Sequence, residues 1–392
     1  MQVFVHTHKY LIESLDTPIN RSLMDDIDWS APLIGIRGAR GIGKTSFLLA
    51  YAKKQFNESD KCLYINLNNF YFTSRTILSF ATEFYQTGGR SLLLDQVYKY
   101  PNWPDELKEC RTQFPDLQIV FTTSLEMNAP NDDEFIVKNA LIYTLEGFSF
   151  REYLNFKTGQ NFKKQSLKDI LANHTAISQE INLLCDPLSY YKEYLHRGYY
   201  PFLLNKKRNY LETLLKIVNF TLEIDVSSQR QVELKYLPKL RKLLYQVAIM
   251  APFQPNISKL SEEIETSRAT VMNYLQYLSD ASLVHLFFSN KTDIAKKPEM
   301  IYLYNPNLAY AVFRGDGQPG SLNKTFFINQ LKQRNKVELD RSKYFIVNGT
   351  TSFTIEESAI ESTKNQNRYR AVDGIKVGKD KMIPLWLFGF LN

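Results

Sequence analysis

Cysteine is scarce in this 392-residue chain, which contains only Cys62, Cys110 and Cys185. The three residues are too scattered for a metal-ligand pattern, and their number is typical of a protein in a reducing compartment. Long hydrophobic runs are also missing, because no stretch approaches the roughly 18 apolar residues of a membrane-spanning helix. The first residues lack the charged and apolar regions of a secretory signal. We therefore expect a cytoplasmic protein without a membrane partner.

Charge of one sign is not concentrated anywhere along the chain. The sequence has 48 basic and 41 acidic residues, and neither kind forms a long block. The resulting net charge of +7 permits contact with an anionic partner but does not require one. What the chain does contain is 44% apolar residues. A globular chain of this length exceeds one ordinary core, so about two or three domains are expected.

The most specific motif follows a short apolar strand over residues 33–37 and matches the fixed positions of the phosphate-binding P-loop, GxxxxGKT. Its glycines let main-chain N–H groups form an anion-binding nest, and Lys44 is placed to reach the outer phosphates of a nucleoside triphosphate. The Thr45 hydroxyl is the expected magnesium ligand. A helix with apolar spacing follows, and its N-terminus favours negative charge. The residues expected to hold the nucleotide are Gly38, Ala39, Arg40, Gly41, Ile42, Gly43, Lys44, Thr45 and Ser46.

A second strand is expected over residues 62–67. A third strand, residues 90–95, has several apolar residues and ends in an acid. This is the pattern of a Walker B strand, in which Asp95 would bind magnesium through water on the side of the ion opposite Thr45. A second acid normally follows and polarises the attacking water, but the next residue is Gln96. An amide can orient water by hydrogen bonding but cannot take its proton. We therefore expect nucleotide binding to persist, while hydrolysis is slow or depends on a base supplied elsewhere.

Two further strands are expected over residues 117–123 and 141–146. The first ends in Thr122 and Thr123, whose hydroxyls are candidates to contact the γ-phosphate or the attacking water, with Thr123 the catalytic candidate. After the second strand, Ser149 is a candidate helix N-cap, which puts Arg151 in the first turn of the next helix. Arg151 either points at the nucleotide or forms a surface ion pair with Glu152 or a neighbour.

The middle of the chain has the spacing of a helix-turn-helix, with helices expected over residues 237–248, 257–264 and 267–278. Strands over residues 283–288 and 300–304 would form a wing, with Lys291, Lys296 and Lys297 between them. Arg268 and Asn273 in the third helix are of the types that read base edges in DNA. The alternative is that this winged helix serves as a lid or a protein contact. Residues 155–235 are expected to form a helical connector.

Four separated segments carry a resemblance to a known family: residues 93–103, 145–154, 194–201 and 384–391. In this order they resemble the bacterial and archaeal AAA-type ATPases that have a C-terminal domain of unknown function. The resemblance implies an α/β fold with a parallel P-loop sheet of strand order 5-1-4-3-2, followed by a helical connector, a winged helix and a small α+β domain resembling restriction endonucleases. It also implies ATP and Mg²⁺ as ligands, and ATP rather than GTP. The expected domains are residues 1–154, 155–235, 236–305 and 306–392.

The chain departs from that family at two places. Gln96 stands where the family usually has a glutamate. Whether the protein hydrolyses ATP is therefore open. In the C-terminal domain, acids that would hold a metal are replaced or displaced, and the remaining Glu356, Glu357 and Lys364 do not have the spacing of a paired metal site. We therefore expect this domain to be a degenerate, nuclease-like remnant.

The function expected from sequence is that of an ATP-binding AAA-type ATPase. It would hydrolyse ATP slowly or conditionally, and the nucleotide state would change the placement of the winged helix and the C-terminal domain. Two alternatives remain open: a non-hydrolysing, ATP-dependent switch, and a DNA-binding regulator that acts through the winged helix. A protein partner or a homo-oligomer is compatible with each of them, and a neighbouring subunit would be the source of any arginine finger.

Overall fold

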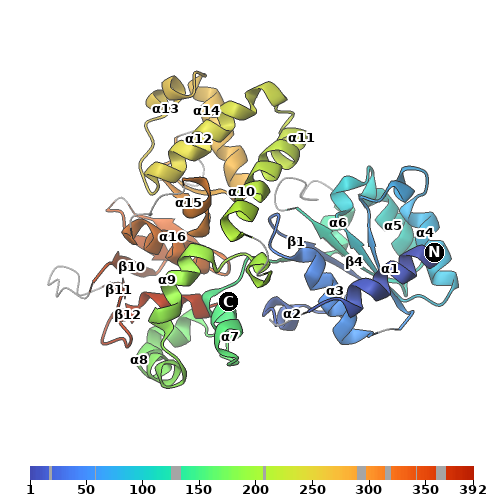
Figure 1. The fold of residues 1–392 in the computed structure, drawn as a ribbon, viewed down its shortest axis with the longest axis horizontal. Helices are drawn as coiled ribbons and strands as arrows, with labels where there is room; N and C mark the ends of the chain where they lie inside the picture. The colour runs from blue at the N-terminus through green and yellow to red at the C-terminus, as the bar shows by residue number, and fades with distance from the viewer. Residues whose placement is uncertain are drawn as a thin grey trace. The chain divides into compact units, whose positions relative to one another are not determined.

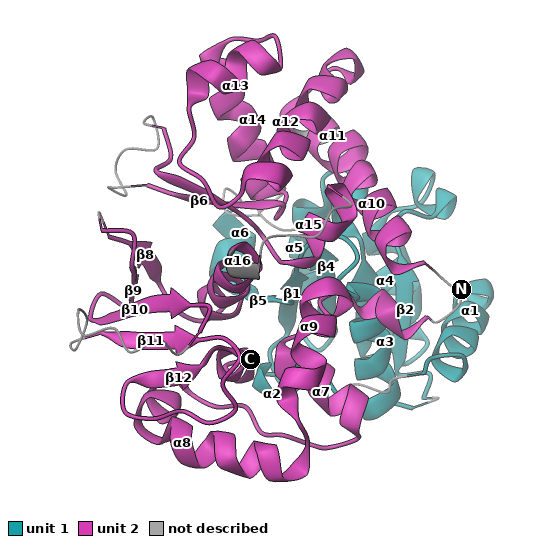
Figure 2. Cartoon of the chain, turned by 60° about the vertical axis from the view of Figure 1, so that its left-hand side comes forward, with its two compact units in different colours: residues 1–146 teal, residues 147–392 magenta. Residues whose placement is uncertain are grey.

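A computed structural model describes residues 1–16, 20–57, 59–124, 134–205, 209–288, 297–313, 319–340, 342–358 and 368–392. The chain forms two compact units, Met1–Glu146 and Gly147–Asn392, which Figure 2 shows in different colours. None of the helices in these described ranges is long and apolar enough to cross a membrane.

Unit 1 is built on a parallel sheet of five strands. They are β1 (Leu33–Arg37), β2 (Cys62–Asn66), β3 (Ser91–Asp95), β4 (Gln118–Thr123) and β5 (Leu141–Thr144), in the order β2-β3-β4-β1-β5. This confirms the α/β fold class and the predicted order 5-1-4-3-2. Figure 1 labels β1 and β4 of this sheet. The helices are α1 (Gln2–Glu13), α2 (Leu23–Asp26), α3 (Lys44–Gln55), α4 (Ile77–Gln86), α5 (Trp103–Gln113) and α6 (Glu134–Asn139), with short 3₁₀ helices η1 (Phe70–Thr73) and η2 (Val97–Lys99).

The inner strands of this sheet are buried on both faces, which explains why they read as continuous apolar runs rather than alternating ones. Phe80 and Phe84 of α4 belong to the core that covers one face. Neighbouring strands also pack closely: a Cβ on Gly35 would lie 2.4 Å from Ile142 Cδ1 and 2.7 Å from a ring carbon of Phe121. A side chain larger than hydrogen therefore does not fit at position 35 unless its neighbours shift.

Unit 2 begins with a group of helices. They are α7 (Phe150–Thr158), α8 (Leu167–Leu184), α9 (Pro187–Arg197), α10 (Tyr210–Phe220), the π-helix η6 (Thr221–Val226) and α11 (Ser227–Arg230), with 3₁₀ helices η5 (Pro201–Leu204) and η7 (Leu234–Tyr236). Next come α12 (Leu237–Met250), α13 (Ile257–Glu263), α14 (Arg268–Asp280) and an antiparallel pair, β6 (Val284–Phe287) and β7 (Met300–Leu303). These match the helices and strands expected for this region, and Val271, Leu275 and Leu278 of α14 are buried.

The last part of unit 2 contains a second sheet. After α15 (Asn307–Val312) and α16 (Pro319–Lys332), strands β8 (Val337–Leu339), β9 (Phe345–Val347), β10 (Thr351–Glu356), β11 (Tyr369–Val372) and β12 (Met382–Pro384) pair in the order β12-β11-β10-β9-β8. Strands β10, β11 and β12 are parallel, whereas β8 and β9 run antiparallel. A 3₁₀ helix, η8 (Leu385–Phe390), ends the chain and is buried throughout.

The compact units divide after Glu146, and the expected domain boundaries stay a prediction. Helix α7 belongs to unit 2, because it packs against α9 and η8, and the Phe150 ring lies 5.4 Å from the ring of Tyr194. The P-loop unit therefore ends before this helix. The three segments expected as separate domains, residues 155–235, 236–305 and 306–392, all fall within unit 2.

Candidate nucleotide site

The P-loop connects β1 to α3 and adopts a conformation that its glycines permit. Gly41 and Gly43 have φ angles of 85° and 90°, in the left-handed region that favours glycine. Gly43 is the N-cap of α3, which begins at Lys44. At Gly38 a Cβ would lie 2.3 Å from Ile42 Cδ1 and 2.5 Å from the main-chain oxygen of Leu145, so this position also needs glycine. The spacing of the motif is thus explained by backbone geometry.

Lys44 lies over this loop. Its ammonium group donates hydrogen bonds to the main-chain oxygens of Gly38, at 2.6 Å, and Ala39, at 2.9 Å. Ile42 is buried beneath the loop, and its main-chain oxygen accepts a hydrogen bond from Arg21. Arg40 is half-buried, and Ser46 is exposed on the first turn of α3. The ammonium group and the N-terminus of α3 provide positive charge at one place, as anion binding requires.

Asp95, at the carboxyl end of β3, is the acid of this site and is 1% exposed. Three hydroxyl groups donate hydrogen bonds to its carboxylate. Thr45 Oγ1 and the Tyr64 phenol both reach Oδ2, at 2.7 and 2.8 Å, and Thr122 Oγ1 reaches Oδ1 at 2.5 Å. The structure thus brings together the two predicted magnesium ligands, Thr45 and Asp95. Hydroxyl and carboxylate oxygens are the hard donors that Mg²⁺ prefers, so these residues fit the ion that the family resemblance implies.

Gln96 follows Asp95 directly and has a left-handed backbone, with φ of 60°. Its main-chain N–H donates to Thr122 Oγ1 at 2.8 Å. The Thr122 hydroxyl therefore donates one hydrogen bond to Asp95 and accepts another from Gln96. The neighbouring Thr123 is different: its hydroxyl is buried and has no hydrogen-bond partner within the described ranges. A catalytic role for Gln96 and Thr123 stays a prediction.

Tyr64 is the residue of this site that sequence reasoning missed. Burial, together with the negative charge of Asp95, raises the pKa of its phenol well above the ordinary value. Its main-chain N–H is also held, because His8 Nδ1 in α1 accepts it at 3.0 Å. Burial lowers the pKa of His8 to about 4, which keeps the imidazole neutral and Nδ1 available as an acceptor. The available signal was a tyrosine within an otherwise apolar strand, one strand away from the Walker B acid.

Arg151 lies in unit 2 and is buried, which contradicts the surface position that an ion pair would have given it. Its guanidinium donates to the main-chain oxygens of Asn392, at 2.8 Å, and Phe162, at 3.0 Å. Ser149 is the predicted N-cap of α7, and Glu152 completes a capping box with it. These contacts give Arg151 a structural role, and its predicted contact with nucleotide gains no support from them.

A structural role for Arg151 leads to a testable result. The Arg151→Met variant should lower the free energy of unfolding of unit 2 by about 2 kcal/mol, because the hydrogen bonds from the guanidinium to two buried main-chain oxygens are lost. Its ATP affinity should match that of the unaltered chain. Thermal unfolding and equilibrium nucleotide binding would check both parts, with the exposed Arg197→Met as the control. A loss of ATP affinity with unchanged stability would instead restore the predicted role at the nucleotide.

Glu356, an acid of the second sheet, is bound within the protein. Arg370 in β11 donates from Nε to both carboxylate oxygens of Glu356 in β10, each at 2.9 Å. Glu357 follows the strand and is exposed, and Lys364 lies outside the described residues. Within the described ranges, no group of three acidic, histidine or cysteine side chains is arranged to hold a metal ion. Of the predicted wing lysines, Lys291 and Lys296 also lie outside the described residues.

Comparisons with known proteins match two family models, the first over most of unit 1 and the start of unit 2, and the second within unit 2. Residues 30–154 match the AAA domain, and residues 188–318 match a domain of unknown function, DUF8612. Together with the strand order and the P-loop, the first match supports an AAA-type P-loop ATPase domain over most of unit 1. The second match extends from α9 to beyond α15, and it assigns no activity.

Two curated relatives come from Methanocaldococcus jannaschii. The uncharacterized protein MJ1637 is 24% identical over 272 residues, which are 64% of this chain and 56% of the relative. The uncharacterized protein MJ1544 is 25% identical over 272 residues, 66% of this chain and 57% of the relative. The chain thus spans little more than half the length of these relatives.

Two solved structures show limited similarity. AMPPCP-bound DnaA from Aquifex aeolicus has 16% identity and a TM-score of 0.28, covering 70% of this chain and 86% of that one. PCH-2 from C. elegans has 15% identity and a TM-score of 0.24, covering 71% of this chain and 67% of that one.

Proposed function

We propose that this chain binds ATP with Mg²⁺ at the P-loop of unit 1 and hydrolyses it slowly or conditionally. The observation that carries the proposal is the hydrogen bond of 2.7 Å between Thr45 Oγ1 and the buried carboxylate of Asp95, beside Lys44 on the same helix turn. Lys44 would bind the outer phosphates, and Thr45 and Asp95 would hold the ion. When bound, Mg²⁺ neutralises charge on the phosphates.

The expectation of slow hydrolysis comes from Gln96. Its main-chain N–H is fixed on Thr122, so its side chain starts from a defined position at the carboxyl edge of the sheet. The amide can hold a water molecule there by hydrogen bonding, but it cannot accept the proton that an attacking water releases. A base supplied by a partner or a second subunit would make turnover conditional on assembly.

The nucleotide state would act on unit 2. We infer that α12, α13, α14, β6 and β7 form a winged helix and that the second sheet is a degenerate nuclease-like domain, and that both change placement between nucleotide states. A ligand shifts such an equilibrium only by its difference in affinity for the two arrangements. If Gln96 prevents hydrolysis altogether, the same coupling gives a switch that responds to ATP binding alone.

DNA binding is the second candidate function. Arg268 and Asn273 are both exposed on α14, the helix that a winged helix places in the major groove. The two acids Glu262 and Glu265 are also exposed a few residues earlier, so the exposed residues of this segment carry both signs of charge. A DNA affinity that falls steeply with salt concentration, and that Arg268→Ala weakens, would favour this candidate.

Equilibrium ATP binding and phosphate release by the purified full chain would test the main proposal. We expect Mg²⁺ to tighten ATP binding, and we expect phosphate release to be slow. Binding without any release would favour the non-hydrolysing switch. The absence of ATP binding, with and without Mg²⁺, would overturn the proposal.

A further inference from the structure

Tyr64 connects the edge of the sheet to the acid of the nucleotide site. It lies in β2, the edge strand, where its main chain pairs opposite Leu93 of β3. Asp95 is two residues further along β3 and so points to the same face of the sheet. The tyrosine side chain is long enough to cover this distance, and its hydroxyl donates to Asp95 Oδ2 at 2.8 Å. The Tyr64 side chain and the Asp95 carboxylate are therefore in contact across the neighbouring strands β2 and β3.

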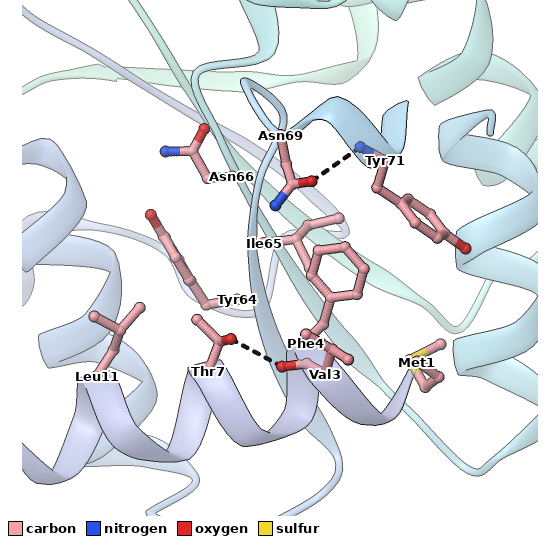
Figure 3. Close-up of a pocket in the computed structure, with 10 residues that line it drawn as sticks. All are labelled: Met1, Val3, Phe4, Thr7, Leu11, Tyr64, Ile65, Asn66, Asn69 and Tyr71. Atoms are coloured by element: carbon pink, nitrogen blue, oxygen red, sulfur yellow. Dashed lines mark hydrogen bonds between the residues drawn. The ribbon is translucent and has the colours of Figure 1, made fainter. Parts of the chain in front are cut away.

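The main chain of Tyr64 is held in place by helix α1. Helix α1 runs alongside β2, and its His8 accepts the main-chain N–H of Tyr64. Figure 3 shows Tyr64 beside Thr7 and Leu11 of α1, where it forms part of the wall of a pocket of about 440 Å³. Tyr64 itself is only 5% exposed. The backbone position of Tyr64 is therefore fixed, and its phenol can orient the carboxylate of Asp95.

We infer that Tyr64 is a positioning residue for the magnesium-binding carboxylate, an inference that rests on the proposed function. Thr45 has one hydroxyl proton, which it gives to Asp95 Oδ2 in this structure. The lone pairs of the same oxygen can bind a metal ion, so Thr45 can serve as a ligand and keep this hydrogen bond. Tyr64 on Oδ2 and Thr122 on Oδ1 are the two donors from outside the expected ligand pair, and each holds one oxygen of Asp95. Such supporting hydrogen bonds fix the geometry of metal-binding groups in proteins.

The test is the Tyr64→Phe variant of the full chain, which removes one oxygen atom and retains the ring. ATP affinity is measured with and without Mg²⁺, and the ratio of the two affinities reports how well the ion is held. We expect this ratio to fall by about 10-fold in Tyr64→Phe, with the metal-free ATP affinity unchanged. The matched control is Tyr51→Phe on α3, because the Tyr51 hydroxyl donates to Gln118 Oε1 at 3.0 Å and not to Asp95. Tyr51→Phe should leave the ratio unchanged.

The outcomes separate this inference from the proposed function. An unaltered chain that binds no ATP contradicts the proposed function itself. If the unaltered chain binds ATP more tightly with Mg²⁺ and Tyr64→Phe retains the full ratio, the positioning role is wrong and the hydrogen bond is only structural.

A second readout does not depend on the affinity of the variant. In the unaltered chain labelled with ¹³C at tyrosine Cζ, the Tyr64 resonance is the one missing from the Tyr64→Phe spectrum. It should shift when Mg²⁺ and ATP are added together and remain in place with ATP alone, whereas the Tyr51 resonance should respond equally to both additions. A Tyr64 resonance that responds equally to both additions would overturn the inference.

Discussion

Replacing Lys44 by alanine is expected to weaken ATP binding by about 100-fold, because the site loses its charged donor to the outer phosphates and a charge-assisted hydrogen bond contributes roughly 1.5–3 kcal/mol. In the structure the ammonium group contacts the main-chain oxygens of Gly38 and Ala39, so it already lies over the loop that would hold the phosphates. Equilibrium titration of the variant with ATP, in the presence of Mg²⁺, would measure the loss. Turnover should become undetectable for the same reason.

The control for this experiment is Lys54→Ala, which removes an equal charge from the same helix. Lys54 is exposed near the far end of α3, and it pairs weakly with Asp25 at 3.7 Å. An exposed ion pair of this kind contributes little to stability, so both fold and ATP affinity should persist. Equal losses in Lys44→Ala and Lys54→Ala would mean that general charge, and not the P-loop, determines the affinity. ATP affinity unchanged in both variants would mean that ATP binds elsewhere.

The parts of unit 1 that sequence predicted are those in which local chemistry determines the structure. The P-loop glycines, Gly41 and Gly43, need left-handed backbone angles that other residues rarely adopt, so their pattern is visible in the chain itself. Parallel strands place their carboxyl ends along one edge, which is why Thr45 and Asp95, 50 positions apart, could be expected to meet.

The missed features depend on contacts between segments that have no shared motif. Tyr64 reaches Asp95 only because β2 pairs with β3 in one register, and a shift of one residue would turn its side chain to the other face. Arg151 follows a strand of the P-loop sheet in sequence, yet the aromatic packing of Phe150 and Tyr194 places its helix in unit 2. Neither arrangement has a local signal in charge or spacing.

Changing Gln96 to glutamate is expected to raise the rate of ATP hydrolysis by about 100-fold, because the carboxylate can accept a proton from the attacking water, and a positioned general base contributes roughly 10²–10⁴-fold. The variant keeps the size of the side chain. It also keeps the left-handed backbone and the hydrogen bond from the main-chain N–H to Thr122, because neither involves the side-chain amide of Gln96. Steady-state phosphate release at saturating ATP would measure the gain, and ATP affinity should change little.

The control is a second glutamine-to-glutamate substitution, which adds the same negative charge away from the site. Gln86→Glu changes an exposed residue at the end of α4, away from the carboxyl edge of the sheet, and should leave hydrolysis unchanged. A gain confined to Gln96→Glu would mean that the site has every element of catalysis except the base. If Gln96→Glu binds ATP normally and remains as slow as the unaltered chain, the missing base is not the limiting element. The requirement would then lie outside the single chain, for example in an arginine that a neighbouring subunit contributes to the phosphates.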